Sequence, residues 1–589
     1  MHASAPVRLA VLAAAALAAA APARAQEGEC REGAISEIFI DNNSVFDVGS
    51  AGLDARFNWA YRLANSMHVA TRPEVVRREL LFAEGDCYSP ALLEDSERIL
   101  RAASFIADAD VYAVPQADGS WHVVVETRDE WSTRLEPQLE SAQLTGLELR
   151  EDNLLGRGQR VAAFFREYQD ERIFGASFGT RQLLGTQWDA DLALSKTPVG
   201  YAVLQRLAYP FRGEGGRWAF RQQLAYEESN FEYFVPTLDG DDLERRRFPV
   251  ESRGFEVGAF RRLGRRGHLT VLGVAVMGEW IAYPQDYLTP REGEEAPDDD
   301  PAAQPDPGIV QGLDTVSSVR AVALVGQRNL VFDRRRALDA VRGAEDVPLG
   351  IEVEVGVGRS LTAFSTDDDL SVDAGFYGAR DLPGGVLAGM RGTLEAKRVF
   401  GDDDGWRNLF GQLDAWAYWR PSEESRHTLV AALSGAGGWR TTVPFQLTLG
   451  NRSGVRGLER HAFTGERRVV ATLEHRAYLG WPYPELFDLG SAAFVDVGHI
   501  WAGGDAFGTS SPIQVSAGVG LRLAFPPGSR RTYRLDVAMP VSGDGTGFGG
   551  LTVSLGIGQA VGRGAVHADP QLRRSSRRAL SASLFSFPP

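Results

Sequence analysis

Apolar and polar residues alternate along most of the chain from about residue 132 onward. In the clearest stretch, Ile513–Phe525, every odd-numbered residue is apolar, whereas the even-numbered positions include Gln514 and Arg522. The same alternation recurs in Tyr533–Val541 and Leu551–Gly558. Successive side chains of a strand point to opposite faces, so the pattern predicts a long series of antiparallel strands with one apolar face.

A soluble β-sandwich also produces alternation, so the surrounding features decide between the two architectures. The strand array is several hundred residues long and contains no helical pattern. Its connections alternate between tight turns, such as Pro526–Gly528 and Trp481–Glu485, and long polar segments such as Asp286–Gly312. A sheet in lipid must close on itself, because lipid offers no partner to backbone groups. We therefore predict a mostly β protein with a transmembrane antiparallel barrel over residues 132–560, short periplasmic turns and a long acidic extracellular loop.

The N-terminus is typical of an exported protein. Arg8 precedes an apolar stretch, Leu9–Ala21, and Ala23-Arg24-Ala25 fits a small-x-small cleavage site. The apolar stretch is too short to span a bilayer. Residues 1–25 are predicted to be a signal peptide that is removed on export.

Residues 34–128 differ from the rest of the chain because helical spacing interrupts the strands. The predicted order is strand, helix, helix, strand, strand, over Ala34–Ile40, Pro73–Phe82, Ser89–Ala103, Ala107–Val114 and Trp121–Thr127. Asp47–Ala70 departs from this pattern. The stretch from Leu80 to Trp131 resembles a POTRA domain, the periplasmic module that handles polypeptides, with Gly85 after the first helix. The resemblance implies a small α/β domain in the periplasm.

The two cysteines of the chain, Cys30 and Cys87, both lie near this module. In an exported protein they suit a disulfide, and metal binding or two free thiols are the alternatives.

Composition argues against several classes of function. The formal net charge of −16 disfavours nucleic acid as a partner, since phosphate binding needs a basic face. The chain has no phosphate loop or dinucleotide fingerprint, and its histidines show no metal-ligand spacing, so no cofactor, metal or catalytic residue is predicted. Gly175–Gly179 fits the Gly-x-Ser-x-Gly hydrolase elbow around Ser177, but that motif needs a strand–turn–helix setting, and here it lies within a strand-like segment.

One loop between two predicted strands carries unusual chemistry. Its sequence, Ser453–Arg468, holds Arg456 between a valine and a glycine. The two following strands place Glu474 and Asp496 on their polar faces, which must point into the lumen because a carboxylate facing lipid costs several kcal/mol. A loop folded into the lumen would bring Arg456 to these carboxylates, whereas the simpler alternative is a solvated surface arginine.

The motifs around this loop resemble the BamA/TamA superfamily of outer-membrane barrels, of the bacterial surface antigen type. Val455-Arg456-Gly457 is similar to that family's Val-Arg-Gly-aromatic signature, with Leu458 in the aromatic position. The motifs that agree in order are Glu474-x-Arg476, Phe494-x-Asp496-x-Gly498, Gly518-x-Gly520-Leu521-Arg522, Arg534-Leu535-Asp536 and Pro540. Asp152–Gln159 is similar to the family's first turn. With the POTRA-like stretch, the resemblance covers most of the mature chain.

The resemblance implies a lumenal loop whose Arg456 contacts Asp496, with Glu474 as second candidate. Further lumenal residues would be Arg476, Arg522, Arg534 and Asp536. It also implies sixteen strands, a weak seam between the first and last strand, and a POTRA domain that engages unfolded chains or partners by β-augmentation. Pattern counting finds up to about nineteen strand-like segments, so some of them are expected to be split strands or pieces of an inner loop. The tail, residues 561–589, is then either periplasmic, with its basic run Arg573–Arg578, or supplies a closing strand, Leu580–Phe587.

Three functions follow as hypotheses. The first is a barrel in the bacterial outer membrane that assembles, inserts or translocates polypeptides, with outer-membrane lipid and unfolded clients or periplasmic proteins as partners. The second is a passive, porin-like channel, which would need neither the module nor the loop signature. The third is an outer-membrane hydrolase acting through Ser177.

Overall fold

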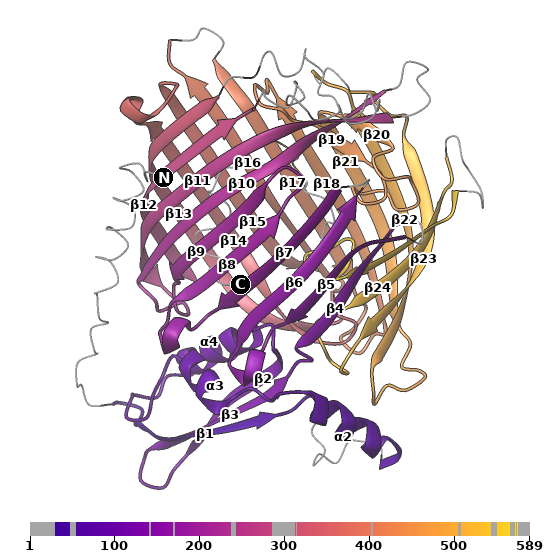
Figure 1. Cartoon of the computed structure of the whole chain (residues 1–589). Coiled ribbons are helices and arrows are strands. Elements are labelled where there is room, and N and C mark those ends of the chain that lie inside the picture. The colour runs from indigo at the N-terminus through magenta and orange to yellow at the C-terminus, as the bar shows by residue number, and fades with distance from the viewer. Residues whose placement is uncertain are drawn as a thin grey trace.

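The computed structural model combines a small α/β module with a large β-barrel (Figure 1). It describes residues 30–46, 55–140, 143–168, 171–236, 243–284, 313, 315–401, 405–504, 508–542, 550–565, 572 and 574. The predicted signal peptide, the loop Asp286–Gly312 and the segment Leu580–Phe587 lie outside these residues. Among the described residues, no helix has the length and apolar character needed to cross a membrane.

The N-terminal module is a three-stranded sheet in the order β1-β3-β2, with helices beside it. Its elements are β1 (Ile35–Asn43), η1 (Ala55–Phe57), α2 (Asn58–Met67), α3 (Pro73–Glu79), α4 (Pro90–Arg101), β2 (Ile106–Pro115) and β3 (Trp121–Asp129). The helix α2 was not predicted and lies in the stretch that departs from the POTRA-like pattern. β1 pairs with β3 in parallel and β2 pairs with β3 antiparallel. Buried Val76, Leu100 and Val123 contribute to its core.

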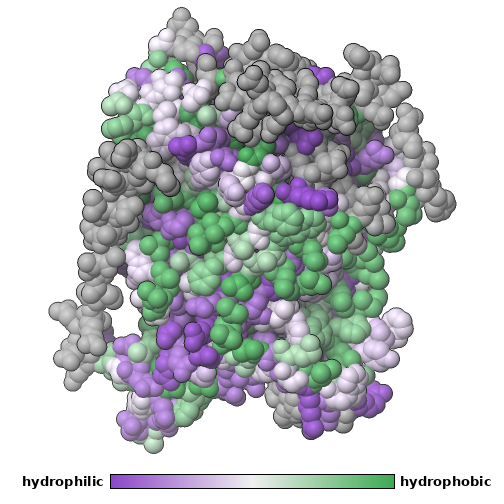
Figure 2. All heavy atoms as spheres, in the orientation of Figure 1, coloured by the Kyte–Doolittle hydropathy of each residue, from purple (hydrophilic) through white to green (hydrophobic). Residues whose placement is uncertain are grey.

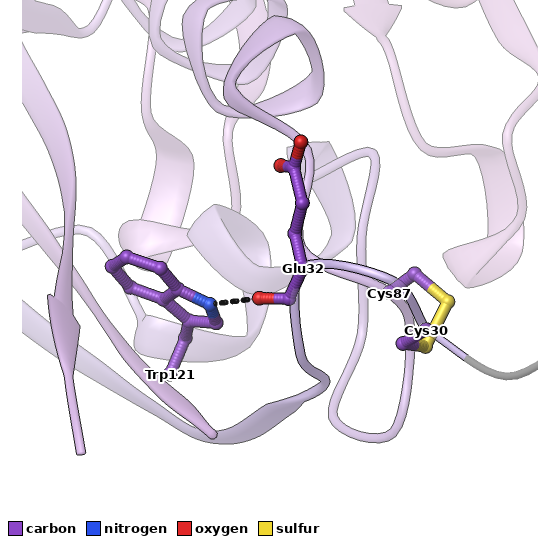
Figure 3. Close-up of a disulfide and its surroundings, with 4 residues drawn as sticks. All are labelled: Cys30, Glu32, Cys87 and Trp121. Carbon is purple, nitrogen blue, oxygen red and sulfur yellow. Dashed lines mark hydrogen bonds between the residues drawn. A yellow bond between two sulfur atoms is a disulfide. The ribbon is translucent and has the colours of Figure 1, made fainter. Parts of the chain in front are cut away.

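A disulfide between Cys30 and Cys87 ties the first described residue to the segment before α4 (Figure 3). The same region is held by the indole of Trp121, whose Nε1 donates to the carbonyl of Glu32 at 2.6 Å (Figure 3). Of the alternatives left open by the sequence, the structure has the disulfide. It closes the start of β1 onto the rest of the module.

Twenty antiparallel strands form the barrel, so the sixteen strands implied by the family resemblance are wrong for this chain. Six short strands come first: β4 (Thr133–Glu140), β5 (Gln143–Glu151), β6 (Gln159–Tyr168), β7 (Glu171–Thr180), β8 (Asp189–Lys196) and β9 (Tyr201–Tyr209). The others are β10 (Trp218–Pro236), β11 (Leu243–Arg265), β12 (His268–Ala282), β13 (Val316–Arg336), β14 (Ala344–Ser360), β15 (Asp369–Leu382), β16 (Val386–Val399), β17 (Trp406–Trp419), β18 (His427–Trp439), β21 (Arg467–Tyr478), β22 (Asp488–Trp501), β23 (Gln514–Ala524), β24 (Tyr533–Pro540) and β25 (Thr552–Ile557). Each of these strands pairs with the next barrel strand along the chain, so all twenty belong to one closed sheet.

The two faces of the wall differ as the alternation predicts. On β23, Val519 and Leu521 are 61% and 48% exposed, whereas Ser516 and Arg522 of the opposite face are buried. Apolar side chains are likewise exposed along β12 and β14, and hydrophobic residues gather on the barrel wall in the view of Figure 2. An outward apolar face and an inward polar face are what a barrel in lipid requires.

The barrel closes between β25 and β4, the last and the first of its strands. β25 is the shortest strand of the barrel, with six residues, and β4 has eight. Within the described residues, a residue-by-residue register links every other neighbouring pair, with one irregularity in β4–β5 and one in β16–β17, but it does not link this pair. The junction therefore has the least regular backbone pairing of the wall.

The module sits at the end of the barrel where β4 begins (Figure 1). Arg101 of α4 donates from Nε and Nη2 to both carboxylate oxygens of Asp346, at 3.0 and 2.7 Å. Glu79 of α3 accepts from Gln182 at 2.7 Å, and the guanidinium of Arg98 lies over the ring of Phe332. Because these contacts involve β13, β14 and the turn between β7 and β8, the module is held across the mouth of the barrel.

The turn Asp152–Gln159, between β5 and β6, also packs on the module. The side-chain amide of Asn153 donates to Thr71 Oγ1 at 2.9 Å. A Cβ added to Gly158 would lie 2.9 Å from the ring of Phe105. The motif singled out as a family-like first turn is therefore a contact surface between module and barrel.

The chain after β25 takes a course that neither prediction anticipated. Its described residues, 559–565, 572 and 574, contact side chains from several strands inside the barrel. The isolated bridge between Phe445 and Arg574 is part of this arrangement. The described portion of the tail thus lies inside the barrel, whereas Leu580–Phe587 and all of the basic run except Arg574, on which the two alternatives depend, lie outside the described residues.

Candidate functional site

The long connection between β18 and β21 folds into the barrel. It contains a two-stranded sheet, β19 (Leu447–Leu449) paired with β20 (Phe463–Gly465). Leu447, Leu449 and Val455 are almost fully buried, and they pack with Val470 and Ile500 of the wall. We call residues 440–466 the inward loop. Its apolar side chains anchor it against β21 and β22, which leaves its polar residues facing the lumenal carboxylates.

Arg456 meets three carboxylates at the tip of the inward loop. Its Nε and Nη2 donate to the two oxygens of Asp496 at 2.8 and 2.9 Å, and its backbone N–H donates to the same side chain at 3.1 Å. Nη1 donates to Glu474 at 2.8 Å and to Asp536 at 3.3 Å. The side chains of all three acids are fully shielded from solvent. This two-pronged geometry is the strongest form of arginine–carboxylate contact.

The surroundings of Arg456 keep it cationic. Burial by itself lowers the pKa of its guanidinium, but the charges of Asp496, Glu474 and Asp536 outweigh burial and hold that pKa above its usual range. The guanidinium also lies 3.3 Å from the ring centroid of Phe494, a cation–π contact. Phe494 was predicted to be lumenal, but nothing in the sequence indicated this stacking.

Further arginines of neighbouring strands surround the same carboxylates. Arg476 donates to Glu474 at 2.8 Å, and Arg522 donates to Asp536 at 2.6 Å. Arg534 lies 3.5 Å from Asp536. We call Arg456 and these residues the lumenal charge cluster: Arg456, Glu474, Arg476, Asp496, Arg522, Arg534 and Asp536. All seven were placed on the lumenal side from the sequence, but direct contact between Arg456 and Asp536 was not foreseen.

Two glycines let the inward loop approach the wall. Gly457 has φ +95°, and a Cβ there would lie about 3.0 Å from the backbone of Met539 on β24. A Cβ on Gly498 of β22 would lie 2.4 Å from the side chain of Val455. A larger residue at either position would hold the loop away from the wall, so these glycines set the depth at which Arg456 sits.

The inward loop also reaches across the lumen to β10. Gln446 donates to the carbonyl of Phe234 and accepts from its backbone N–H, at 3.0 and 2.8 Å. The ring of His461 stacks on Phe234 with centroids 4.1 Å apart. Leu458, in the aromatic position of the family signature, is buried in the apolar cluster of the loop. The loop is therefore fastened to two separate sectors of the barrel.

A cavity of about 970 Å³ remains inside the barrel. Its lining includes α4 of the module, Arg262 and Arg328 of the wall, and Arg563 and Arg574 of the tail. The module thus covers one mouth of the barrel, and the tail and the inward loop occupy part of the interior that a simple pore would leave open.

The hydrolase motif lies in a different setting. Gly175–Gly179 falls within β7, where Ser177 pairs with Ala162 on one side and Ala193 on the other. A short 3-10 turn, Leu183–Gly185, follows this strand. The motif therefore lacks the strand–turn–helix geometry of a nucleophile elbow.

Residues 445–560 match the family model described as the Omp85 superfamily domain. This region of the chain is therefore similar to the Omp85 superfamily domain. It spans most of the inward loop and β21 to β25, so the whole lumenal charge cluster lies within it. The resemblance to the BamA/TamA barrels is thereby confirmed.

Solved structures with a similar chain course were also found. BamA from Haemophilus ducreyi lacking POTRA domains 1-3 is 12% identical, with 90% of this chain and 84% of that chain covered and a TM-score of 0.36. CdiB from Acinetobacter baumannii is 11% identical, with 89% and 74% covered and a TM-score of 0.38. CdiB from Escherichia coli is 12% identical, with 94% and 96% covered and a TM-score of 0.38. No curated protein matches the sequence of this chain.

Proposed function

We propose that this protein inserts or translocates polypeptides at the bacterial outer membrane, with the inward loop docked on the lumenal carboxylates as a fixed component of the barrel. The observation that carries the proposal is the contact of Arg456 with Asp496, Glu474 and Asp536 inside an Omp85 superfamily domain. A buried ion cluster of this kind costs desolvation and specifies a single arrangement of its members. Such a cluster is suited to a barrel in which the inward loop must keep one position while a client polypeptide moves past the loop.

The junction between β25 and β4 supports the same proposal. A client strand that enters the membrane from the lumen must separate a pair of neighbouring wall strands, and every other pair is held by a residue-by-residue register, with irregularities in β4–β5 and β16–β17. Breaking short, irregular pairing needs the loss of fewer hydrogen bonds. We place the opening at this seam.

The module supplies a place for clients or periplasmic proteins. The sheet order β1-β3-β2 leaves β1 and β2 as edge strands, and Tyr112 and Val114 near the end of β2 are 44% and 42% exposed. An extended peptide can add to such an edge through backbone hydrogen bonds. The module would thus deliver an unfolded chain to the barrel mouth that it covers.

Transfer of an unfolded outer-membrane protein into liposomes tests this function directly. Liposomes that contain the wild-type protein should speed folding of the client over empty liposomes, and Arg456→Ala should remove most of that gain. Arg440→Ala, a substitution of an exposed arginine at the base of the same loop, is the matched control and should retain it. In cells, depletion should reduce specific members of the outer-membrane or secreted proteome.

The passive-channel alternative predicts different experimental results. A channel should give a large, steady conductance in planar bilayers, and that conductance should survive deletion of residues 34–128. Such a result, together with an unchanged proteome on depletion, would replace polypeptide handling by diffusion as the function.

A further inference from the structure

The C-terminal segment enters the lumen directly after β25. Gln559 is 2% exposed, accepts from Arg522 Nε at 2.9 Å and donates to the carbonyl of Asp339 at 2.7 Å. The carbonyl of Val561 accepts from Arg476 Nη2 at 2.7 Å. Arg476 and Arg522 belong to the lumenal charge cluster, so the tail begins on two arginines that pair with carboxylates contacted by Arg456.

The next residues are held mainly through their backbone. The N–H of Arg563 donates to the hydroxyl of Tyr418 at 2.6 Å, and the N–H of Gly564 donates to Asp339 at 2.7 Å. Gly562 has φ +114°, and a Cβ there would lie 2.3 Å from the Tyr418 hydroxyl. The side chain of Arg563 pairs with Glu345 at 3.3 Å. These contacts hold the backbone of the tail, and position 562 accepts only a residue without a side chain.

Two later residues reach the inward loop. Arg574 donates from both terminal nitrogens to the two oxygens of Glu395, at 2.7 and 2.8 Å, and its guanidinium lies 4.7 Å from the ring centroid of Phe410. Its backbone forms an antiparallel bridge with Phe445. Leu572 packs on the apolar cluster of the inward loop. The described residues of the tail thus contact β14 at Glu345 and, further along the chain, the inward loop.

The wall beside the tail is rich in carboxylates. The acids that line the cavity from β14 to β17 are Glu345, Asp346, Glu352, Glu354, Asp373, Glu395 and Asp414. Arginines of the tail point at two of them, Glu345 and Glu395. The wall therefore presents carboxylates, and the inward loop beside it presents an apolar contact for Leu572 and a backbone edge at Phe445.

We propose that this wall is a lumenal binding track for an extended, arginine-bearing polypeptide, and that the chain's own C-terminal segment occupies it at rest. The track accepts backbone along Tyr418 and Phe445 and cationic side chains at Glu345 and Glu395. A translocating client with basic residues displaces the tail and takes its place. The identity of that competitor rests on the proposed function, whereas the track and its resident segment do not.

Labelling of a single cysteine in the full-length protein tests the resident segment. Leu572→Cys introduces a reporter without background, because the two native cysteines are joined in a disulfide. In liposomes, a charged maleimide should react with this cysteine much more slowly than in the denatured chain. Glu395→Arg should speed the reaction at least tenfold, about 1.4 kcal/mol, and adding Arg574→Glu should restore protection.

The matched control is Asp191→Arg, which reverses a carboxylate that pairs with Arg160 and Arg206 on the other side of the barrel, away from the tail. It should leave labelling at the parent rate. Labelling in the parent as fast as in the denatured chain would overturn the proposal. So would a Glu395→Arg rate equal to the parent rate in a barrel that remains folded.

Competition tests whether the track is exchangeable. A synthetic peptide with the sequence of residues 559–574, added to the Leu572→Cys protein, should speed labelling in a saturable way. The same peptide with glutamate in place of Arg563 and Arg574 should not. No acceleration by the basic peptide would overturn an exchangeable track. Since no client is present, these outcomes are independent of any failure to transfer an outer-membrane protein.

Discussion

The inward loop and the C-terminal segment both lie inside the barrel, but they are held in different ways. The loop is joined to the wall at both ends, by β18 and β21, and its Arg456 shares three fully buried carboxylates. The tail is joined only through β25, and its Arg574 pairs with one acid, Glu395, at side-chain exposures of 11% and 16%.

Removing one partner of a buried charge cluster leaves several uncompensated charges, whereas a partly hydrated pair loses little when broken. The difference separates a structural segment from a replaceable one. The inward loop is therefore part of the folded barrel, whereas the tail occupies the lumen as a replaceable segment.

The largest expected effect comes from Arg456→Ala. Glu474, Asp496 and Asp536 would remain buried without their central cation, so the free energy of unfolding should fall by about 3–5 kcal/mol. Urea unfolding in lipid vesicles, followed by tryptophan fluorescence, measures this loss. Arg440→Ala should change it by less than about 0.5 kcal/mol. If Arg456→Ala and Arg440→Ala lowered the free energy of unfolding by equally small amounts, the inward loop would be no more structural than the tail.

The pairing itself is measured by a double-mutant cycle between Arg456→Ala and Asp496→Ala. Because the two side chains share two hydrogen bonds, from Nε and Nη2 of Arg456 to Asp496, we expect a coupling energy of about 0.5–3 kcal/mol. Fully additive losses would mean that the two residues stabilise the barrel independently.

A matched pair of glycine substitutions compares the two segments directly. Gly457→Ala forces a side chain into a left-handed backbone against Met539 and should destabilise the barrel by about 1–2 kcal/mol. In Gly562→Ala the new side chain would likewise clash with Tyr418, but we expect only the tail to be displaced. It should speed labelling of Leu572→Cys and leave barrel unfolding within about 0.5 kcal/mol of the parent. A loss of barrel stability at Gly562 would show that the tail is structural.

Salt gives the smallest effect. The Debye length falls from about 10 Å at 0.1 M to about 3 Å at 1 M salt, which weakens partly hydrated pairs more than buried ones. Labelling of Leu572→Cys should therefore rise a few-fold over this range. A cysteine at Val455, which is fully buried in the loop, should remain protected at both concentrations. Parallel behaviour of the two reporters would contradict the comparison.

Much of this architecture was predictable from local patterns. The alternation in β21 and β22 placed Glu474 and Asp496 in the lumen, because a period of two leaves no other face for a charge in a lipid-embedded sheet. Helix spacing and turn residues also predicted α3, α4, β2 and β3 to within a few residues. The motif around Arg456 then indicated that the loop supplies the cation that pairs with the lumenal carboxylates.

Other features depend on how distant segments meet. The number of strands follows from the curvature and stagger of the whole sheet, which local alternation does not encode. The family resemblance implied sixteen strands, and the count of strand-like segments was closer to the twenty in the structure. Contact of Asp536 with Arg456 depends on how deeply the loop enters, which Gly457 and Gly498 set through their packing on β24 and on Val455. α2 forms in a stretch whose composition carries no strong helix signal.

By itself, the sequence determined which side of the wall each residue faces and which residues carry charge into the lumen, because side-chain alternation and the cost of charge in lipid are local rules. Only the tertiary structure decided that twenty strands close the barrel, that Asp536 joins the loop and that the tail turns inward. These outcomes depend on distances across the lumen between segments far apart in the chain, and no local pattern measures such distances.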